Sequence, residues 1–391
     1  MSLNPAFSNP AQVDLEINPN RQTQLWQTSQ SFATPVSQWN AYLNALCLDT
    51  LMPWFREESL TATPALRQAG LEGIWEVVGG TVITVDGARL LLWATEVIDL
   101  DELRIPQEWV DLPTWIADYY LLVQVNPDDH WLRVGGWVTH HQLKTQGHYD
   151  WRDRTYSLDE SALNPDLGAL QVAHQLNPVS STRALVAALS PLPLAQAESL
   201  LRRLSNPEIL HPRLEIPFEQ WGALCQHDGW RHQLMRQRRR QFDRPSVSQW
   251  IQRGIAGIEG MLNWAMDWAT VQYQPDAVGA RGDDTAAPIT GIARQLAIAG
   301  QAYELRVIPL TRGGETIWRF ELQNLIPGAS IPAGFVLRLL TEDLQPFEGN
   351  EDRAETAVEQ LYIELALAPG EGIVWAIEPT PDQYESEILW F

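Results

Sequence analysis

Two regions of the chain alternate apolar and polar residues with the period of β-strands. Between residues 71 and 160, the apolar runs are joined by Asp86-Gly87 and by the segment NPDD at 126–129. An Asp-Gly pair between two such runs is typical of a type I′ hairpin turn. We therefore predict five to six antiparallel strands over 71–160, ending in RTYSLD, with a proline-punctuated connection between the hairpins.

The second alternating region follows residue 289. Its short apolar runs include YELRVIPL, IWRFELQ, LYIELAL, GIVWAIE and EILWF. Six or seven short strands within about 100 residues are the pattern of a β-sandwich. We expect an immunoglobulin-like sandwich here.

Apolar residues at helical spacing occupy two other parts of the chain. Trp39, Leu43, Leu46 and Leu51 predict a helix after residue 36, which Pro53 should bend or end. Three helical patterns follow residue 160: PLAQAESLLRRLSNP, the longer PFEQWGALCQHDGWRHQLMRQRRRQF, and VSQWIQRGIAGIEGMLNWAMDWATV. The last is apolar on nearly all sides, which is typical of a buried helix.

These patterns predict an α+β fold made of consecutive parts. The parts are an extended arm (1–35), a helix plus antiparallel β domain (36–160), a helical region (161–273), a linker (274–288) and the β-sandwich (289–391).

Composition limits the function of the chain. A net charge of −22 over 391 residues argues against general affinity for nucleic acid or an anionic membrane. Neither a signal-peptide pattern nor an apolar run of spanning length is present, so we expect a cytoplasmic protein. Cys47 and Cys225 lie far apart in helical patterns, which favours two buried free thiols.

The cations and aromatic residues point to binding. Lys144 is the single lysine among 27 cations, and the chain has 18 tryptophans. Arginine and tryptophan are both enriched at interface hot spots, so we expect a protein partner or self-association. The alternative is a compositional bias of the genome combined with tryptophan-filled cores.

Two long stretches resemble a known group of proteins. The segments ELRIPQEWVDLPTWIADYYLLVQVNPDDHWLRVGGWVTH and RLLTEDLQPFEGNEDRAE…LYIELALAPGEGIVWAIEPTP resemble a cyanobacterial family of conserved proteins of unknown function. The resemblance covers roughly 70–391. It implies a cytoplasmic, cyanobacterial protein and suggests a regulatory role with a partner, but it assigns no catalytic residues.

A group of histidines is the first candidate site. His140 or His141, together with His148 and Asp150, offers imidazole and carboxylate groups suited to a metal-dependent or acid/base hydrolase. His140 and His141 are adjacent, however, and would point to opposite faces of a strand. The alternative is a polar strand end and loop.

A run of arginines is the second candidate. Nine arginines against five acids lie between 201 and 244, including Arg231, Arg236, Arg238, Arg239 and Arg240. They could dock an acidic partner or, less in keeping with the net charge, contact phosphates of a nucleic acid. Alternatively, they stabilise a helix C-terminus and pair with the chain's own carboxylates.

An acidic segment is the third candidate. Glu348, Asn350 and Asp352 partly match a calcium loop, but Arg353 occupies the position that needs glycine. A solvated acidic loop is the alternative.

Catalytic and phosphate-binding patterns are missing from the sequence. It contains no G-x-S-x-G, HExxH or dinucleotide fingerprint, so we expect no cofactor. Our leading hypothesis is a non-enzymatic regulatory module that binds a protein through the arginine run and Trp390, in the terminal aromatic strand. The alternatives are the hydrolase and the nucleic-acid binder.

Overall fold

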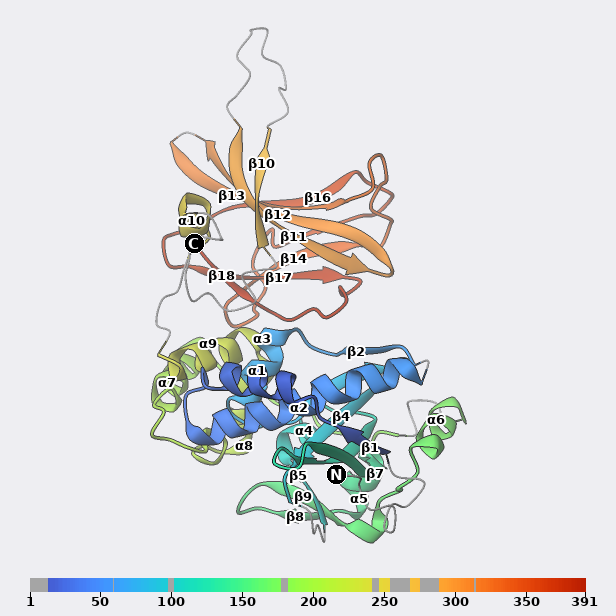
Figure 1. Cartoon of the computed structure of the whole chain (residues 1–391). Coiled ribbons are helices and arrows are strands. Elements are labelled where there is room, and N and C mark those ends of the chain that lie inside the picture. The colour runs from blue at the N-terminus through green and yellow to red at the C-terminus, as the bar shows by residue number, and fades with distance from the viewer. Residues whose placement is uncertain are drawn as a thin grey trace. The chain divides into compact units, whose positions relative to one another are not determined.

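The chain forms two compact units, Met1–Gln241 and Phe242–Phe391, which are described separately below. The computed structural model describes residues 13–58, 60–97, 102–176, 182–240, 246–253, 268–274, 288–312 and 314–391. The fold is mixed α+β, as the sequence predicts (Figure 1).

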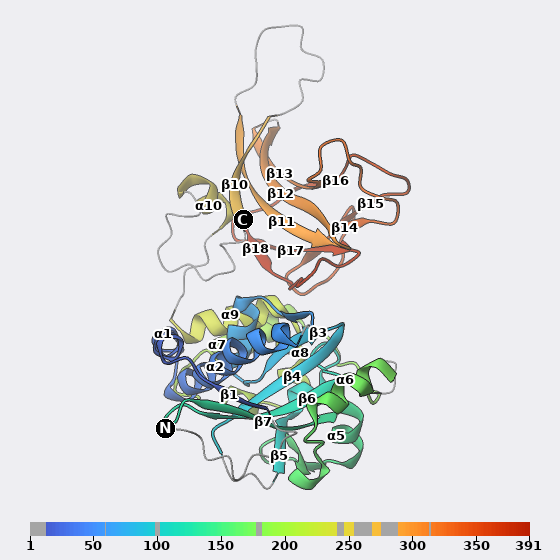
Figure 2. The ribbon, with the colours of Figure 1, turned by 45° about the vertical axis from the view of Figure 1, so that its right-hand side comes forward.

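A curled six-stranded sheet is the centre of the N-terminal unit (Figure 2). Its strands, in spatial order, are β1 (Val13–Glu16), β7 (Trp131–Thr139), β6 (Tyr119–Asn126), β4 (Ala88–Thr95), β3 (Thr81–Val85) and β2 (Ala62–Pro64). The predicted Asp86-Gly87 turn is confirmed, with φ of 48° and 86°. The β4–β6 pair is parallel, so the expectation of a purely antiparallel arrangement is wrong.

The predicted connection between the hairpins is itself structured, which explains the parallel pair. It contains β5 (Glu102–Pro106) and the short helix α4 (Gln107–Asp111). β5 joins a separate three-stranded sheet with β9 (Thr155–Asp159) and β8 (His148–Asp150). This excursion lets the chain re-enter the main sheet in the same direction.

Helix α2 (Pro35–Glu57) covers one face of the curled sheet. Thr34 begins it with a capping box, accepting a hydrogen bond from the Ser37 amide at 3.1 Å. Pro53 does not end the helix and lies in its last turns. Leu46 and Leu51 share a core with sheet residues such as Leu121.

Three expectations about the N-terminal unit are wrong. Residues 13–35 are not an extended arm, because β1 and the Asn18-capped helix α1 (Pro19–Ser29) lie there. Helix α3 (Gln68–Trp75) occupies the start of the region in which strands were expected from residue 71. The long helix expected over 217–242 is two helices, since His227 leaves the helical conformation at φ −88° and ψ 101°.

The middle helices belong to the N-terminal unit. They are α6 (Leu167–Leu176), α7 (Leu194–Leu204), α8 (Phe218–Gln226) and α9 (Asp228–Arg238). Helix α9 packs against α3, α7 and α8, so this region shares a fold with the β-strands that precede it.

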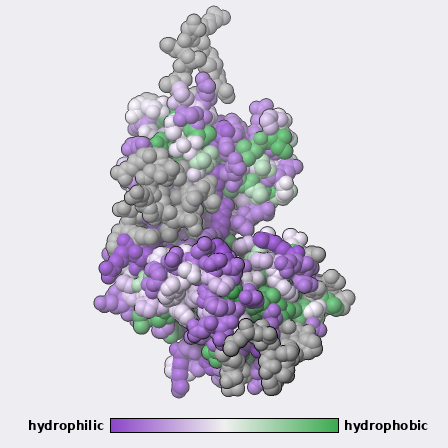
Figure 3. All heavy atoms as spheres, in the orientation of Figure 1, coloured by the Kyte–Doolittle hydropathy of each residue, from purple (hydrophilic) through white to green (hydrophobic). Residues whose placement is uncertain are grey.

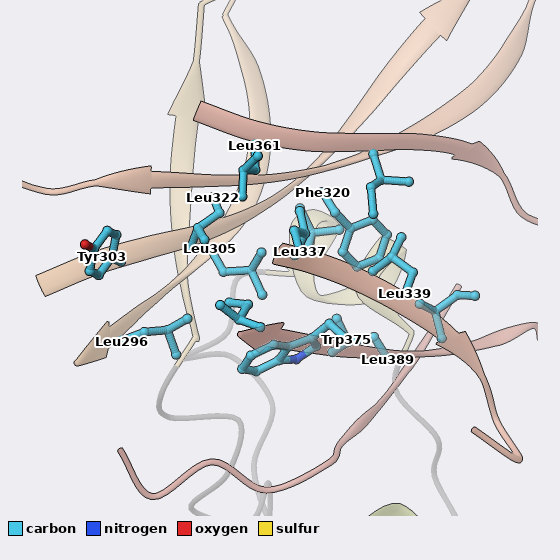
Figure 4. Packing of buried hydrophobic residues seen from close by; sticks show 14 of the residues in the cluster. Leu296, Tyr303, Leu305, Phe320, Leu322, Leu337, Leu339, Leu361, Trp375 and Leu389 are labelled. Carbon is cyan, nitrogen blue, oxygen red and sulfur yellow. The ribbon is translucent and has the colours of Figure 1, made fainter. Parts of the chain in front are cut away.

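Two antiparallel sheets enclose one core in the C-terminal unit. The larger sheet has the order β10 (Trp268–Tyr273), β11 (Ile289–Ile298), β12 (Gln301–Arg312), β13 (Glu315–Asn324) and β16 (Gln360–Ala366). The smaller has the order β15 (Glu351–Arg353), β14 (Val336–Thr341), β17 (Gly372–Glu378) and β18 (Ile388–Trp390). Leu305 and Phe320 of the larger sheet meet Leu337, Leu339 and Trp375 of the smaller one in this core (Figure 4).

The immunoglobulin-like strand order is not confirmed. Four consecutive strands, β10 to β13, form a meander in the larger sheet, whereas immunoglobulin sheets interleave strands from both halves of the chain. The apolar helix expected over 247–271 is also wrong at its end: α10 (Val247–Arg253) is helical, but 268–273 is β10. Residues 254–267 and 275–287, which include most of the predicted linker, lie outside the described residues.

Candidate binding sites

His140 is a structural residue inside the N-terminal unit. It begins helix α5 (His140–Gln146), capped by Thr139, so the expected strand position is wrong. Its Nε2 lies 2.9 Å from the Val110 carbonyl, and its Nδ1 accepts the Ala184 amide at 3.0 Å. This pattern requires the neutral ring with its proton on Nε2. Burial lowers the pKa of His140, which keeps the ring neutral.

The other residues of the predicted hydrolase do not complete a metal site. His141 and His148 are exposed, and Asp150 accepts the Arg152 amide at 2.9 Å. Because both nitrogens of His140 are already bonded, its ring has no lone pair left for a metal. Among the residues that the structure describes, no group of three or more His, Cys, Asp or Glu side chains could hold a metal ion.

The structure instead assembles a polar cluster around the single lysine, Lys144 of α5. Its Nζ donates to Asp111 and to the Tyr156 hydroxyl, at 2.5 Å each, and Tyr156 donates to Asp111 at 3.0 Å. Burial lowers the pKa of Lys144, but the hydrogen bonds to Asp111 and Tyr156 outweigh it and raise the pKa. Burial raises the pKa of Tyr156.

The protonation states of this cluster make it a fixed ion pair. At neutral pH the ammonium of Lys144 and the phenol of Tyr156 both keep their protons, so neither is an activated nucleophile or base. Sequence reasoning did not single out this cluster. The one available signal was a lone lysine among 26 arginines.

Three residues of the arginine run lie inside the N-terminal unit. Arg231 is buried over the Trp115 ring and donates to the Cys225 carbonyl at 2.8 Å. Arg238 and Arg239 have nearly fully buried side chains, and both pair with Glu76 of the α3 C-cap at 3.2 and 3.4 Å. The alternative of internal pairing therefore describes these three side chains.

The remaining arginines of the run lie closer to the surface. Arg236 is half-buried and Arg240 is exposed, just past the end of α9. The three buried arginines hold the helices together.

The acidic segment is a loop that leads into strand β15, and its predicted ligands have different partners. Glu348 is exposed, the Asn350 amide donates to the Leu339 carbonyl at 2.8 Å, and Asp352 accepts the Tyr362 amide at 2.8 Å. The neighbouring Glu351 pairs with Arg338 at 3.0 Å. These contacts connect the acidic segment to strands β14 and β16.

Trp390, predicted to contact a partner, is half-buried and pairs with Gly372 in the smaller sheet.

Two partly exposed tryptophans lie next to each other in the N-terminal unit. Trp26 of α1 and Trp39 of α2 are 41% and 36% exposed, and their rings meet edge to face at 5.9 Å. Tyr42 is buried beneath and contacts both rings. The face of the molecule drawn in Figure 3 is mostly hydrophilic, with hydrophobic residues in small separate groups. We call Trp26 and Trp39 the tryptophan pair.

The described residues also line two hollows. An apolar cavity of about 300 Å³ lies in the N-terminal unit between α2, β4 and α6. A polar groove of about 640 Å³ lies on the larger sheet of the C-terminal unit, where Arg319 covers the Tyr362 ring at 4.1 Å and pairs with Glu321 at 2.8 Å. Because arginines of this groove are paired with carboxylates, the groove shows no preference for binding anions.

Fold and sites together define a two-unit α+β protein with an exposed aromatic surface. Its described helices include none that is long and apolar enough to cross a membrane. The chain belongs to the family described as protein of unknown function DUF1822, whose model matches residues 15–390. No curated protein and no solved structure shows significant similarity to it. The expected membership of a family of unknown function is thus confirmed over nearly the whole chain, while its restriction to cyanobacteria stays an expectation.

Proposed function

We propose that the protein is a non-enzymatic regulatory module that binds a partner protein through the tryptophan pair. The observation that carries the proposal is the exposure of two adjacent indole rings, since tryptophan is among the residues most enriched at interface hot spots. A second observation supports a non-enzymatic role. His140, Lys144 and Tyr156, the described residues that most resemble a catalytic group, each keep one protonation state at neutral pH.

Contacts within the unit hold the tryptophan pair in place before any partner arrives. Trp39 Nε1 donates to Glu96 at 3.2 Å. Arg21 of α1 pairs with Asp49 of α2 at 2.5 Å, which fixes the two helices that carry the rings. Rings that are already ordered lose little conformational entropy on binding.

Charge selects the kind of partner. Glu96 contacts Trp39, and the chain as a whole carries −22. Opposite charge speeds association and suppresses binding of like-charged proteins. We therefore assign the surface to a protein segment that presents an apolar side chain flanked by lysine or arginine. A second copy of this acidic chain fits less well.

A capture experiment with matched variants tests the proposal. Wild type, the double variant Trp26→Ala/Trp39→Ala and the control Trp151→Ala are used as baits in a native lysate; Trp151 is 73% exposed and lies on the turn after β8. We expect a stoichiometric basic partner on wild type and on Trp151→Ala. Titration calorimetry should then give an affinity for the double variant at least about 30-fold weaker, since hot-spot truncations cost 2 kcal/mol or more.

Three outcomes would contradict the proposal. They are an affinity of the double variant equal to that of wild type, an equal loss in Trp151→Ala, and capture of no stoichiometric protein. Light scattering of the wild-type protein shows whether a second copy occupies the surface instead. Circular dichroism checks that each variant is folded.

A further inference from the structure

The apolar cavity of the N-terminal unit is lined by elements from distant parts of the sequence. It lies between the C-terminal part of α2, the β3–β4 hairpin, β6 and α6. The described lining residues are Trp54, Phe55, Leu60, Val85, Asp86, Ala88, Leu90, Leu121, Leu167, Leu170 and His174. A space of about 300 Å³ with mostly apolar walls is large enough to hold a small molecule.

The walls offer little to water. Apart from the Trp54 indole, the polar side chains among the described lining residues are those of Asp86 and His174. His174 Nε2 lies 3.0 Å from the Asp86 carbonyl oxygen, and the Asp86 carboxylate accepts the Thr61 amide at 2.9 Å. A buried water needs two to four polar partners, and these groups are already bonded to each other or to the backbone.

Helix α6 covers the cavity with a regular apolar stripe. Leu167, Leu170 and His174 are spaced three and four residues apart, which places them on one face of the helix. The two leucines face the cavity, and His174 connects the helix to the turn at Asp86. The helix therefore forms one apolar wall of the pocket.

We propose that this cavity binds a small, uncharged, apolar molecule of about ten carbon atoms. The size follows from the volume, because a water-sized or methylene-sized group fills roughly 30 Å³. Pockets of this volume with mostly apolar walls are typical small-molecule sites. A carboxylate in the ligand is disfavoured, since it would lose its hydration and meet the negative Asp86.

Thermal unfolding and titration calorimetry of the full chain test the proposal with two probes of similar shape. n-Butylbenzene is uncharged, and 4-phenylbutyrate carries a carboxylate. We expect n-butylbenzene to bind saturably and to raise the Tm of the wild-type protein, because a ligand that binds the native state stabilises it. 4-Phenylbutyrate should bind at least about tenfold more weakly.

A matched pair of variants locates the binding site. Ala88→Leu places extra methyl groups into the cavity from β4, while Ala41→Leu makes the same change at a buried position of α2 away from it. We expect Ala88→Leu to abolish the response to n-butylbenzene and Ala41→Leu to keep it. If either variant fails to fold, Leu170→Phe fills the cavity from α6 and Trp151→Ala serves as the control.

The proposal is overturned if n-butylbenzene does not bind the wild-type protein or binds it equally well after the cavity is filled. Equal affinity for 4-phenylbutyrate would overturn the assignment to an uncharged ligand. Neither result depends on the tryptophan pair, so the proposal for this cavity and the proposal for the partner surface can each be refuted without affecting the other.

Discussion

At the scale of single residues, burial rather than residue type decides what the ionisable groups of this protein can do. His140 has the side chain of a general base, yet its two nitrogens hold α5 to Val110 and Ala184. Lys144 has the side chain of a nucleophile, yet hydrogen bonds to Asp111 and Tyr156 keep it charged. Both groups connect elements of the fold.

The buried state of His140 predicts a pH dependence of stability. Its pKa is lowered in the folded protein, whereas the unfolded chain should titrate near the ordinary value of about 6.5. As the pH falls below about 6.5, the unfolded state therefore binds a proton that the native state does not. The contribution of His140 to stability is present above this pH and decreases below it, by up to about 1.4 kcal/mol per pH unit.

Urea unfolding at pH 7.5 and 5.5 measures this effect. His140→Gln removes the titration while its amide can still donate to Val110, so the variant should lose less stability between the two pH values than wild type. The control His148→Gln alters an exposed histidine and should behave like wild type. An identical pH dependence of all three proteins would show that His140 does not titrate on unfolding.

The arginine run shows why residue roles were hard to predict from the sequence. A cluster such as Arg236–Arg240 looks the same in sequence whether it faces solvent or a buried carboxylate. The decisive partners, Glu72 and Glu76, precede it by more than 160 positions along the chain. Sequence spacing carries no information on such a contact, so both alternatives stayed open until the structure placed α9 on α3.

At the scale of elements, arginine–carboxylate pairs fasten the middle helices to the β region. Arg238 of α9 pairs with Glu76 and also donates to the carbonyls of Leu204, Asn206 and Ile209 behind α7. A second fastening joins Arg213 to the buried Glu108 of α4 at 2.7 Å. The planar guanidinium can satisfy several acceptors at once, which lysine cannot do.

Removing the charge of Glu76 should strongly destabilise the N-terminal unit. Glu76→Gln keeps the size of the side chain but leaves the buried guanidinium of Arg238 without its carboxylate, while Arg239 keeps Glu72 as a partner. We expect a loss of about 3–5 kcal/mol in the free energy of unfolding, measured by urea denaturation, since breaking one side of a buried pair leaves an uncompensated charge.

The exposed pair between Arg21 and Asp49 supplies the control. Asp49→Asn removes the charge of an ion pair at the surface and should cost at most about 1 kcal/mol. Equal losses in the two variants would mean that burial of the Glu76 cluster has no energetic consequence.

Elements defined by local signals were predicted well, and elements defined by distant contacts were not. The Asp86-Gly87 hairpin and helix α2 follow from turn chemistry and helical periodicity within a few residues. The parallel β4–β6 pair and strand β10 depend on where the chain returns after an excursion, which periodicity does not encode. The same holds for the candidate site. The number of tryptophans predicted a binding surface, but the sequence did not identify Trp26 and Trp39, among 18 tryptophans, as exposed neighbours.

At the scale of the whole molecule, the division into two units differs from the division that the sequence suggested. The sequence separated an N-terminal β domain from a helical region at residue 160. The hydrophobic cores of the structure do not follow this boundary. The main sheet and α2 share one core, made of residues within 17–170. The C-terminal sheets share another core, made of residues within 247–391. The middle helices contact α3 and contribute buried arginines to the N-terminal unit.

This division predicts which fragments fold. Fragments 1–241 and 242–391 each keep a complete core and should unfold cooperatively, each with a Tm within a few degrees of a transition of the full chain. Fragment 1–160 keeps the whole main sheet but loses Leu167 and Leu170 from its core, and the removal of α9 exposes helix α3, in which residues 69–75 are buried in the full chain. It should therefore lack a cooperative transition in circular dichroism and calorimetry. A stable fragment 1–160 would instead support the boundary at residue 160. It would show that this part of the chain folds without the arginine pairs.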